Sequence, residues 1–516
     1  VTSNRRGRRQ WNMRGKDFLL AAVSAVGQVQ PHEISATLHS AASFFFILSA
    51  YFVVLPLRDE GAISLGLSNL PALFVGSLIL TLIAVPLSTH LFAVPQLSKS
   101  RALVLILRFF SLSLILCFFL WRFSSASTSS SSKFVVSIHL NMNSTDNNEK
   151  NGTSANTSQA SGTSSLFYVY VRVCFFLWVA LLNLIAISST WARVIDVMDS
   201  DSGSRLFGFI GAGATLGQLF GSLFATGMAW LGPFLLLFSA LFMELAAQCS
   251  KGIVNDSKYL YEELTLVRDG VVNSPTVVEM HTPSSDPIVD SPKSSHSPMD
   301  PHFSAIIDGI RLVLSSTYLL HVSSFLWLSA VVSSFFYFQK VTVVAETVTT
   351  SVERRKLFAE INSWIAAFIL TGQLTLTSRI LTVAGVTVAI CCAPFIALCN
   401  LITVAVWPTW VAVAFCETLR KVVTYVVTRP GRELLFTVVS QEEKYKAKIC
   451  IDVIVQRVGD ATAAGMFQLL STSLHGKTPL VSACALPVCI LWIAIAFHVG
   501  RLHGDLCRSP RTLPIL

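Results

Sequence analysis

The sequence has few charged residues. Asp, Glu, Lys and Arg together make up 13% of its 516 residues, whereas hydrophobic residues make up 53%. Soluble globular domains contain about 25% charged residues. Tyrosine is also scarce beside phenylalanine, with 9 Tyr against 35 Phe, and a lipid-facing surface needs no hydroxyl group. The composition excludes an ordinary soluble protein, and the length allows about a dozen membrane spans of ~20 residues.

Several chemical motifs are also missing. The 11 cysteines are scattered without a CxxC pair, which argues against a disulfide framework and against a zinc or other metal site. The sequence contains no GxxxxGK[ST] loop, no HExxH and no nucleophile elbow, so we expect neither an enzyme nor a bound cofactor. The net charge of +9 is typical of basic cytoplasmic loops in a membrane protein, and we expect no nucleic-acid partner.

Apolar segments alternate with polar ones along the chain. Six precede a long polar linker and six follow it, which predicts an all-α membrane protein with twelve transmembrane helices in two six-helix halves, a major-facilitator-like fold. The expected spans are 32–57, 71–94, 103–121, 166–195, 206–230, 231–247, 303–338, 357–381, 383–404, 408–427, 449–470 and 479–499.

The polar segments divide the chain. The expected parts are a basic tail (1–31), an N-terminal half (32–248) with a polar outer loop (124–165), a cytosolic linker (249–302), a C-terminal half (303–500) and a second tail (501–516). The outer loop carries the sequons Asn143, Asn151 and Asn156, which are glycosylated only if the loop faces a secretory lumen. The linker is either a plain tether or a regulatory loop phosphorylated at its Ser/Thr-Pro sites.

A glycine-rich segment follows the fourth span. Gly211-Ala-Gly213 with Gly217 imitates a dinucleotide-binding fingerprint, but that motif needs a preceding strand and a soluble βαβ unit. Here Gly213, Gly217 and Gly221 recur every four residues inside an apolar segment. This spacing predicts close helix packing in the membrane.

Charged residues near the ends of spans are the candidate functional groups, because charge inside lipid is costly and faces protein or water. Arg58, Asp59 and Glu60 end the first span, either as an interfacial charge cap or as a group that couples an ion or reads a substrate. Arg193 and Asp196 have i, i+3 spacing and favour a gate or structural lock.

The C-terminal half has a second group of charges. Glu417 and Lys421, at i, i+4, are expected to pair and to leave Arg420 free. The basic stretch 429–460 is expected to join two spans, and Arg432 is expected to meet Asp196 in a closed gate. These charges either read an anionic substrate or form a salt-bridge network that closes the cytoplasmic side; both roles are compatible with a transporter. The charged residues of this stretch are Arg429, Arg432, Glu433, Lys448, Asp452, Arg457 and Asp460.

Three segments carry a family resemblance: YFVVLPLRDEG from Tyr51, STWARVIDVMDSDSGSRLFGFIGAGATLGQ from Ser189 and RPGRELLFTVVSQEEKYKAK from Arg429. They resemble the ATP/ADP antiporter (nucleotide transporter) family, in its facilitator-like bacterial and plant branch, a distant relative of the major facilitator superfamily. The resemblance implies alternating access and roles for Arg58, Asp59, Arg432 and Lys448. Gly61 and Asp460 stand near positions where the nucleotide exchangers carry Lys.

The sequence therefore predicts a multi-pass integral membrane protein that works as a secondary transporter for a small organic anion, with ATP and ADP among the candidates. The alternatives are a proton-coupled carrier of a non-nucleotide solute and a receptor or scaffold that transports nothing. We expect a monomer in contact with the lipid bilayer. Whether the membrane is that of a plastid, an endomembrane or the plasma membrane stays open.

The predicted topology is testable. Three spans separate the sequon loop from the linker, so epitope tags near Asn151 and Ser284 should lie on opposite sides of the membrane. Protease digestion of sealed vesicles should remove one tag and spare the other. Equal accessibility of the two tags would contradict the arrangement of six spans before and six after the linker.

Overall fold

The computed structural model describes residues 33–93, 98–142, 154–198, 200–253, 309–439, 447, 450–474 and 478–508. These residues are helical nearly throughout, and the described part of the chain contains no strand. Of the predicted sites, Lys448, Asn143 and Asn151 lie outside the described residues, as does most of the linker, and Asn156 is described by its backbone alone.

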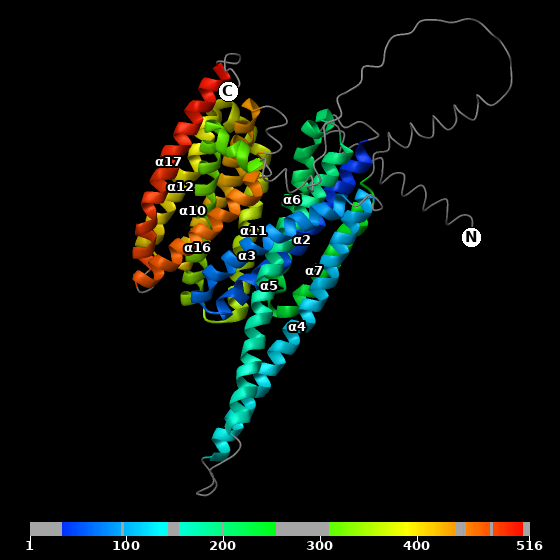
Figure 1. Cartoon of the computed structure of the whole chain (residues 1–516), viewed down its shortest axis with the longest axis vertical. Helices are drawn as coiled ribbons and strands as arrows, with labels where there is room; N and C mark the ends of the chain where they lie inside the picture. Colours follow the sequence, from blue (N-terminus) through cyan, green and yellow to red (C-terminus); the bar gives the residue numbers. More distant parts are fainter. Residues whose placement is uncertain are drawn as a thin grey trace, which may run out of the picture.

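The first group of helices precedes the linker (Figure 1). Its members are α2 (Ile34–Ser64), α3 (Leu70–Ala93), α4 (Lys99–Met142), α5 (Ser154–Val197), α6 (Ser200–Gly227) and α7 (Leu235–Ser250), with 3-10 turns η1 (Leu67–Asn69) and η2 (Ala229–Phe234). Val53, Leu57, Leu107 and Leu235 are among the buried side chains that form the core of this group.

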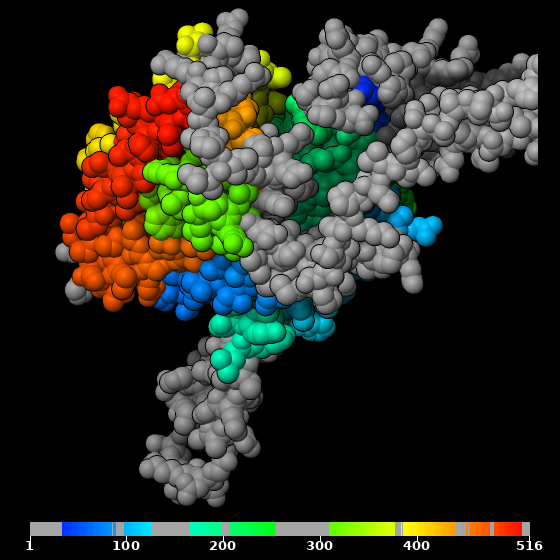
Figure 2. Space-filling view, turned by 45° about the horizontal axis from the view of Figure 1, so that its top comes forward, coloured from blue at the N-terminus to red at the C-terminus, as the bar shows by residue number. Residues whose placement is uncertain are grey.

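The second group follows the linker. Its members are α10 (Thr317–Thr347), α11 (Ser351–Thr375), α12 (Thr377–Val406), α13 (Trp410–Val423), η3 (Thr424–Thr428), α14 (Arg429–Leu435), η4 (Phe436–Val438), η5 (Ile451–Val455), α16 (Gln456–Ser473) and α17 (Thr478–Arg508). The core of this group also takes in Leu70 of α3 and Phe176 of α5, so the two groups share buried surface. Figure 2 shows them side by side.

Ten of the described helices are long and apolar enough to cross a membrane. A helix satisfies its own backbone hydrogen bonds, which is what a lipid environment requires. The runs 410–438 and 451–473 are more polar and include the π-helical turns η3 and η5, and neither meets that criterion. The structure is thus a nearly all-helical membrane protein with about ten candidate spans.

Three predicted boundaries were wrong. Helix α2 continues through Arg58, Asp59 and Glu60 to Ser64, and both carboxylates are buried, so the triplet does not cap the helix from outside. Most of the predicted outer loop 124–165 is helix in α4 and α5, because extending an existing helix adds hydrogen bonds without a new nucleus. The stretch after Arg429 likewise continues as α14 and η4.

The expected span 303–338 is divided in the structure, because residues 309–315 are helical and a break at Ser316 separates them from α10. The larger part of the span corresponds to α10, which covers Thr317–Thr347 and starts with Ser316, whose side chain accepts a hydrogen bond from the backbone N–H of Leu319. Because the helix is displaced toward the C-terminus, Lys340 lies inside it and is buried. The span expected from the sequence, 303–338, ends before this lysine.

Helix α6 packs closely on α2 along its glycines. A Cβ atom added at Gly213, Gly217 or Gly221 would stand 2.7, 2.2 or 2.6 Å from the backbone oxygen of Ala41, Phe45 or Ser49, respectively. The Ser49 hydroxyl also donates a hydrogen bond to the Gly217 carbonyl, at 3.2 Å. Residues four apart on each helix therefore meet in register, which only small residues allow.

Replacing Gly217 with leucine should destabilise the fold by about 3 kcal/mol or more, because the side chain would overlap the α2 backbone. The matched control is Gly211→Leu on the same helix, where an added Cβ meets no atom within 4 Å. Thermal unfolding and size-exclusion chromatography in detergent would measure the difference. Equal melting temperatures for the two variants would contradict the packing interpretation.

Candidate functional site

Helix α10 brings polar side chains from three other helices together. Four of its residues, Ser333, Ser334, Tyr337 and Lys340, contact charged groups on α2, α13 and α16. The spacing of three and four residues places most of them along one side of the helix. This helix is therefore the common wall of the candidate site.

The first contact crosses between the two groups of helices. Arg58 and Asp59 of α2 form an ion pair at 2.7 Å, and their side chains are 12% and 1% exposed. The Tyr337 hydroxyl of α10 donates a hydrogen bond to Asp59 Oδ1 at 2.8 Å. The Arg58 guanidinium also lies over the rings of Phe176 and Tyr337, at 5.0 and 5.6 Å. The charge pair is thereby held by aromatic groups of both halves.

The second contact joins α10 to α13. Lys340 Nζ lies 3.8 Å from Glu417 Oε1, and Arg420 Nη2 lies 2.5 Å from Glu417 Oε2. All three side chains are less than a tenth exposed. Arg420 also donates a hydrogen bond to Ser333, at 3.0 Å. The predicted partner of Glu417 was wrong: Arg420 takes the carboxylate, since the i, i+3 direction faces it, and Lys421 forms no ion pair within the described residues.

The two contacts form one electrostatic group, because Lys340 interacts with both Glu417 and Asp59. Three buried cations, Arg58, Lys340 and Arg420, face two carboxylates. Next to them, Lys421 and Arg429 approach Tyr425, with Arg429 Cζ 5.5 Å from its ring centroid. The surplus of positive charge in a region of low dielectric can attract and hold an anion.

A further ion pair ties the halves together at the expected outer end. Glu60 of α2 meets Arg355 of α11 at 3.5 Å, and both side chains are about nine-tenths buried. Arg355 Nε also donates a hydrogen bond to the carbonyl of Ala229 in η2, at 3.2 Å. We call the Glu60–Arg355 pair the outer latch. Arg355 is not among the site residues predicted from the sequence.

The remaining predicted charges form separate pairs. Asp196 bonds to Arg193 at 2.9 Å and also to Lys99 of α4, while Arg193 reaches the carbonyl of Ile253. Arg432 instead meets Asp452 at 2.8 Å and Glu433 at 3.4 Å. The expected Arg432–Asp196 pair is therefore wrong for this conformation, in which local carboxylates lie nearer to Arg432.

Helix α16 contributes the last predicted pair. Arg457 lies 3.1 Å from Asp460, and Asp460 accepts a hydrogen bond from Ser334 of α10 at 2.5 Å. The structure thus connects Asp460 to the α10 wall. Among the described residues, the ion pairs of Arg193, Asp196 and Arg432 are with residues outside α10.

Sequence reasoning missed Tyr337, Lys340 and Arg355. Lys340 stands alone after a long apolar run, which is the usual sign of an intramembrane charge, but the predicted span ended two residues before it. Tyr337 is one of only 9 tyrosines, a weaker signal. Arg355 could not be found from sequence, because its carboxylate partner lies almost 300 positions earlier.

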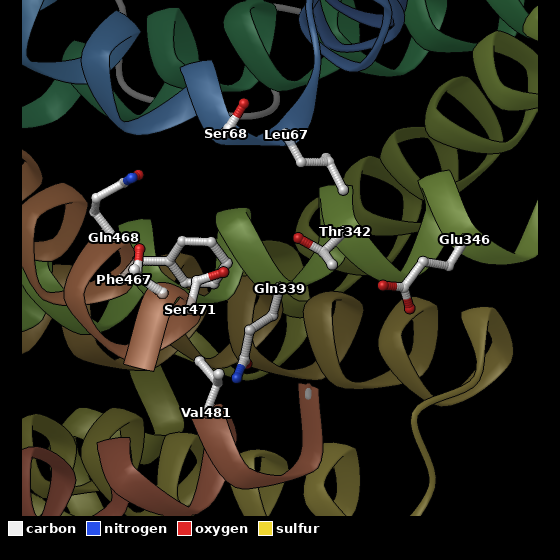
Figure 3. A pocket seen from close by; sticks show the side chains of 10 residues that line it. Leu67, Ser68, Gln339, Thr342, Glu346, Phe467, Gln468, Ser471 and Val481 are labelled. Carbon is white, nitrogen blue, oxygen red and sulfur yellow. The ribbon is translucent and has the colours of Figure 1, made fainter. Parts of the chain in front are cut away.

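A cavity of about 210 Å³ lies between η1 and helices α10, α16 and α17 (Figure 3). Gln339, Thr342, Glu346 and Ser471 are among its lining residues. This lining contains a carboxylate and no cation, so the cavity lacks the positive surplus of the α10 wall. Among the described residues, no group of three or more His, Cys, Asp and Glu could hold a metal ion.

Glu417 neutralises two buried cations, so its loss should be costly. Glu417→Gln should lower the free energy of unfolding by about 3–5 kcal/mol, because Lys340 and Arg420 would lose their carboxylate. Lys340→Met in the same protein should recover part of the loss. The control is Glu244→Gln, which breaks an exposed pair with Arg108 and should cost about 0–1 kcal/mol. Thermal melts that are alike for the two single variants would contradict this account.

Solved structures of membrane transporters are similar to this one. The structure is similar to a POT family transporter solved in complex with a thioalcohol-conjugated peptide, with a TM-score of 0.53, 11% identity and coverage of 90% of this chain and 96% of that one. It is also similar to a mutant of the nucleoside transporter NupG, with a TM-score of 0.50, 11% identity and coverage of 91% and 99%. No curated protein matches the sequence.

These identities are low, so the likeness shows the fold alone: that of transporters of the major-facilitator type. The sequence of the second half is more specific, since the family model described as TLC ATP/ADP transporter matches residues 329–503. That match covers α11, α12, α13 and α16 as well as most of α10 and α17. The resemblance predicted from the motifs is thereby confirmed to this extent: residues 329–503 of this membrane transporter match the family model described as TLC ATP/ADP transporter.

Proposed function

We propose that the protein is a secondary transporter that moves an organic anion by alternating access, and that nucleotides such as ATP and ADP are its first candidate substrates. The observation that carries the proposal is the surplus of buried cations along α10, where Arg58, Lys340 and Arg420 face only Asp59 and Glu417. Arginine in particular suits the planar oxygen groups of phosphate and carboxylate.

The proposal treats the run 410–438 and the run 451–473 as spans ten and eleven. Neither run is among the ten described helices that are long and apolar enough to cross a membrane. Their charges point to a protein interior, since Glu417 and Arg420 are buried and Asp460 bonds to α10. Intramembrane charges of this kind mark substrate or ion pathways. With them, each half has six spans, and the linker joins the halves.

Alternating access is supported by the contacts that join the two halves at the expected outer end. At the expected outer end, the outer latch and the Asp59–Tyr337 hydrogen bond join the halves, and Phe74 of α3 packs on Phe338 at 4.6 Å. Nearer the C-terminal end of α11, the Thr215 hydroxyl of α6 also donates a hydrogen bond to Gln373, at 3.2 Å. We interpret this conformation as closed to the outside.

A nucleotide substrate is supported by the family match over residues 329–503, whose description names ATP and ADP. The buried carboxylates Asp59 and Glu417 support the alternative of a proton-coupled carrier, because carboxylates inside a membrane protein often mark ion or proton pathways. The two readings differ in what drives transport: an opposing gradient of the exchanged anion, or a gradient of pH.

The test is uptake of labelled ATP, ADP, nucleosides and non-nucleotide organic anions by liposomes containing the purified protein. We expect exchange of an anion that Lys340→Gln reduces at least tenfold in apparent affinity, because a desolvated charge pair with the substrate is lost. The control is Lys356→Gln, whose lysine is 58% exposed and pairs with Glu360 within one helix.

Other outcomes select the alternatives. Uptake of a neutral or cationic solute that requires a pH gradient would support the proton-coupled carrier. A folded protein that moves none of these compounds would contradict transport and leave the receptor or scaffold. Anion uptake that is equal in Lys340→Gln and Lys356→Gln would remove Lys340 from the substrate site.

A further inference from the structure

A second arginine lies beside the outer latch. Arg172 of α5 is only 7% exposed, and its Cδ lies 3.9 Å from the place of a Cβ at Gly61, the residue after Glu60. Its guanidinium stacks on Trp121 of α4, with Cζ 3.0 Å from the ring centroid, and interacts electrostatically with Glu60 and Arg355. Two guanidinium groups therefore compete for one carboxylate, and Arg355 holds it in this conformation.

Arg172 has spare hydrogen-bonding capacity. Its Nε and Nη1 atoms are buried and have no hydrogen-bond partner within the described part of the chain. The rest of the guanidinium lies near Tyr168, with Cζ 4.8 Å from that ring centroid. A buried hydrogen-bond donor of a charged group that has no partner lowers the stability of that conformation. A group that stays under-bonded in one conformation is well placed to gain a partner in another.

Two of the three charged groups lie in one half and the third lies in the other. Glu60 on α2 and Arg172 on α5 belong to the same half, and these two helices pack against each other. Arg355 belongs to α11 in the other half. Any motion that separates the halves at the outer end breaks Glu60–Arg355 but leaves Glu60 beside Arg172.

We propose that Arg172 is a positioning residue that takes over Glu60 when the outer latch opens. This inference rests on the proposed alternating access. Without Arg172, opening would take the Arg355 guanidinium away from Glu60 and put no other in its place, and the loss of one partner of a buried pair is unfavourable. Arg172 lowers that cost, so the outward-open conformation stays within reach.

Gly61 makes this arrangement possible. A Cβ at this position would stand 3.3 Å from the Trp121 ring, which supports the Arg172 guanidinium from behind. A larger residue would push Trp121, and with it Arg172, away from α2. The small residue next to Glu60 therefore keeps the second arginine close to the carboxylate it would receive.

The test measures conformation directly and does not depend on knowing the substrate. The reporter is Ala62→Cys at the outer end of α2, because Ala62 is 1% exposed and belongs to the core that the two halves share. The background replaces the exposed native cysteines 174, 399, 484 and 507 with serine. The labelling rate with a membrane-impermeant maleimide then reports how often the outer side opens.

We expect Arg172→Gln to lower this labelling rate about tenfold and Arg172→Lys to lower it less, because a lysine keeps the charge. Glu60→Gln together with Arg172→Gln should restore labelling to at least the rate of the parent protein, since no carboxylate is then stranded. The control is Arg108→Gln, an exposed cation of the same half, which should leave the rate unchanged.

A purely structural role for Arg172 on Trp121 predicts the opposite, because removing Glu60 would not repair lost packing. Labelling of Arg172→Gln at the parent rate, or a double variant as slow as the single one, would overturn the proposal. If Arg172→Gln fails to fold, the comparison of Arg172→Lys with and without Glu60→Gln decides by the same criterion. If the parent protein transports none of the tested compounds while the labelling rates change as expected, only the proposed function is contradicted.

Discussion

Charge buried in a membrane protein must be paired, and most of this structure follows from that constraint. Taking an ion out of water costs several kcal/mol even after relaxation. Each buried carboxylate at the α10 wall therefore has a cation at its side: Arg58 for Asp59, and Lys340 with Arg420 for Glu417. Since these partners come from different helices, the pairing fixes how α2, α10 and α13 lie against one another.

Contacts within a half differ in kind from contacts between the halves. Gly217 against Phe45 and Ser239 hydrogen-bonded to Ala50 hold α2 within its own half, through backbone atoms that offer no second arrangement. The outer latch and the Asp59–Tyr337 bond cross between halves and involve side chains that have other partners at hand. A carrier needs both kinds of contact: rigid bodies, and a boundary whose interactions can be exchanged.

The fold was readable to the extent that it depends on local composition. Apolar runs placed most helices, and the glycines spaced four apart on α6 indicated a close helix contact before any partner was known. The predicted helix ends were wrong where charged residues lie inside a helix. The charged triplet 58–60 was expected to end α2. The sequence alone could not show that Asp59 bonds to Tyr337 and that Glu60 pairs with Arg355, because both partners lie far along the chain.

By itself the sequence determined a helical membrane protein, a match of residues 329–503 to a transporter family model, and the charged residues that are candidates for the site. Hydrophobicity and spacing are local properties, and they act on a helix before it meets another. Only the tertiary structure decided which charges share a site: Lys340 with Glu417 and Asp59, Arg432 with Asp452 instead of Asp196, and Arg172 beside Glu60. Electrostatic pairing falls off with distance in space, and distance in space is set by how helices remote in sequence pack.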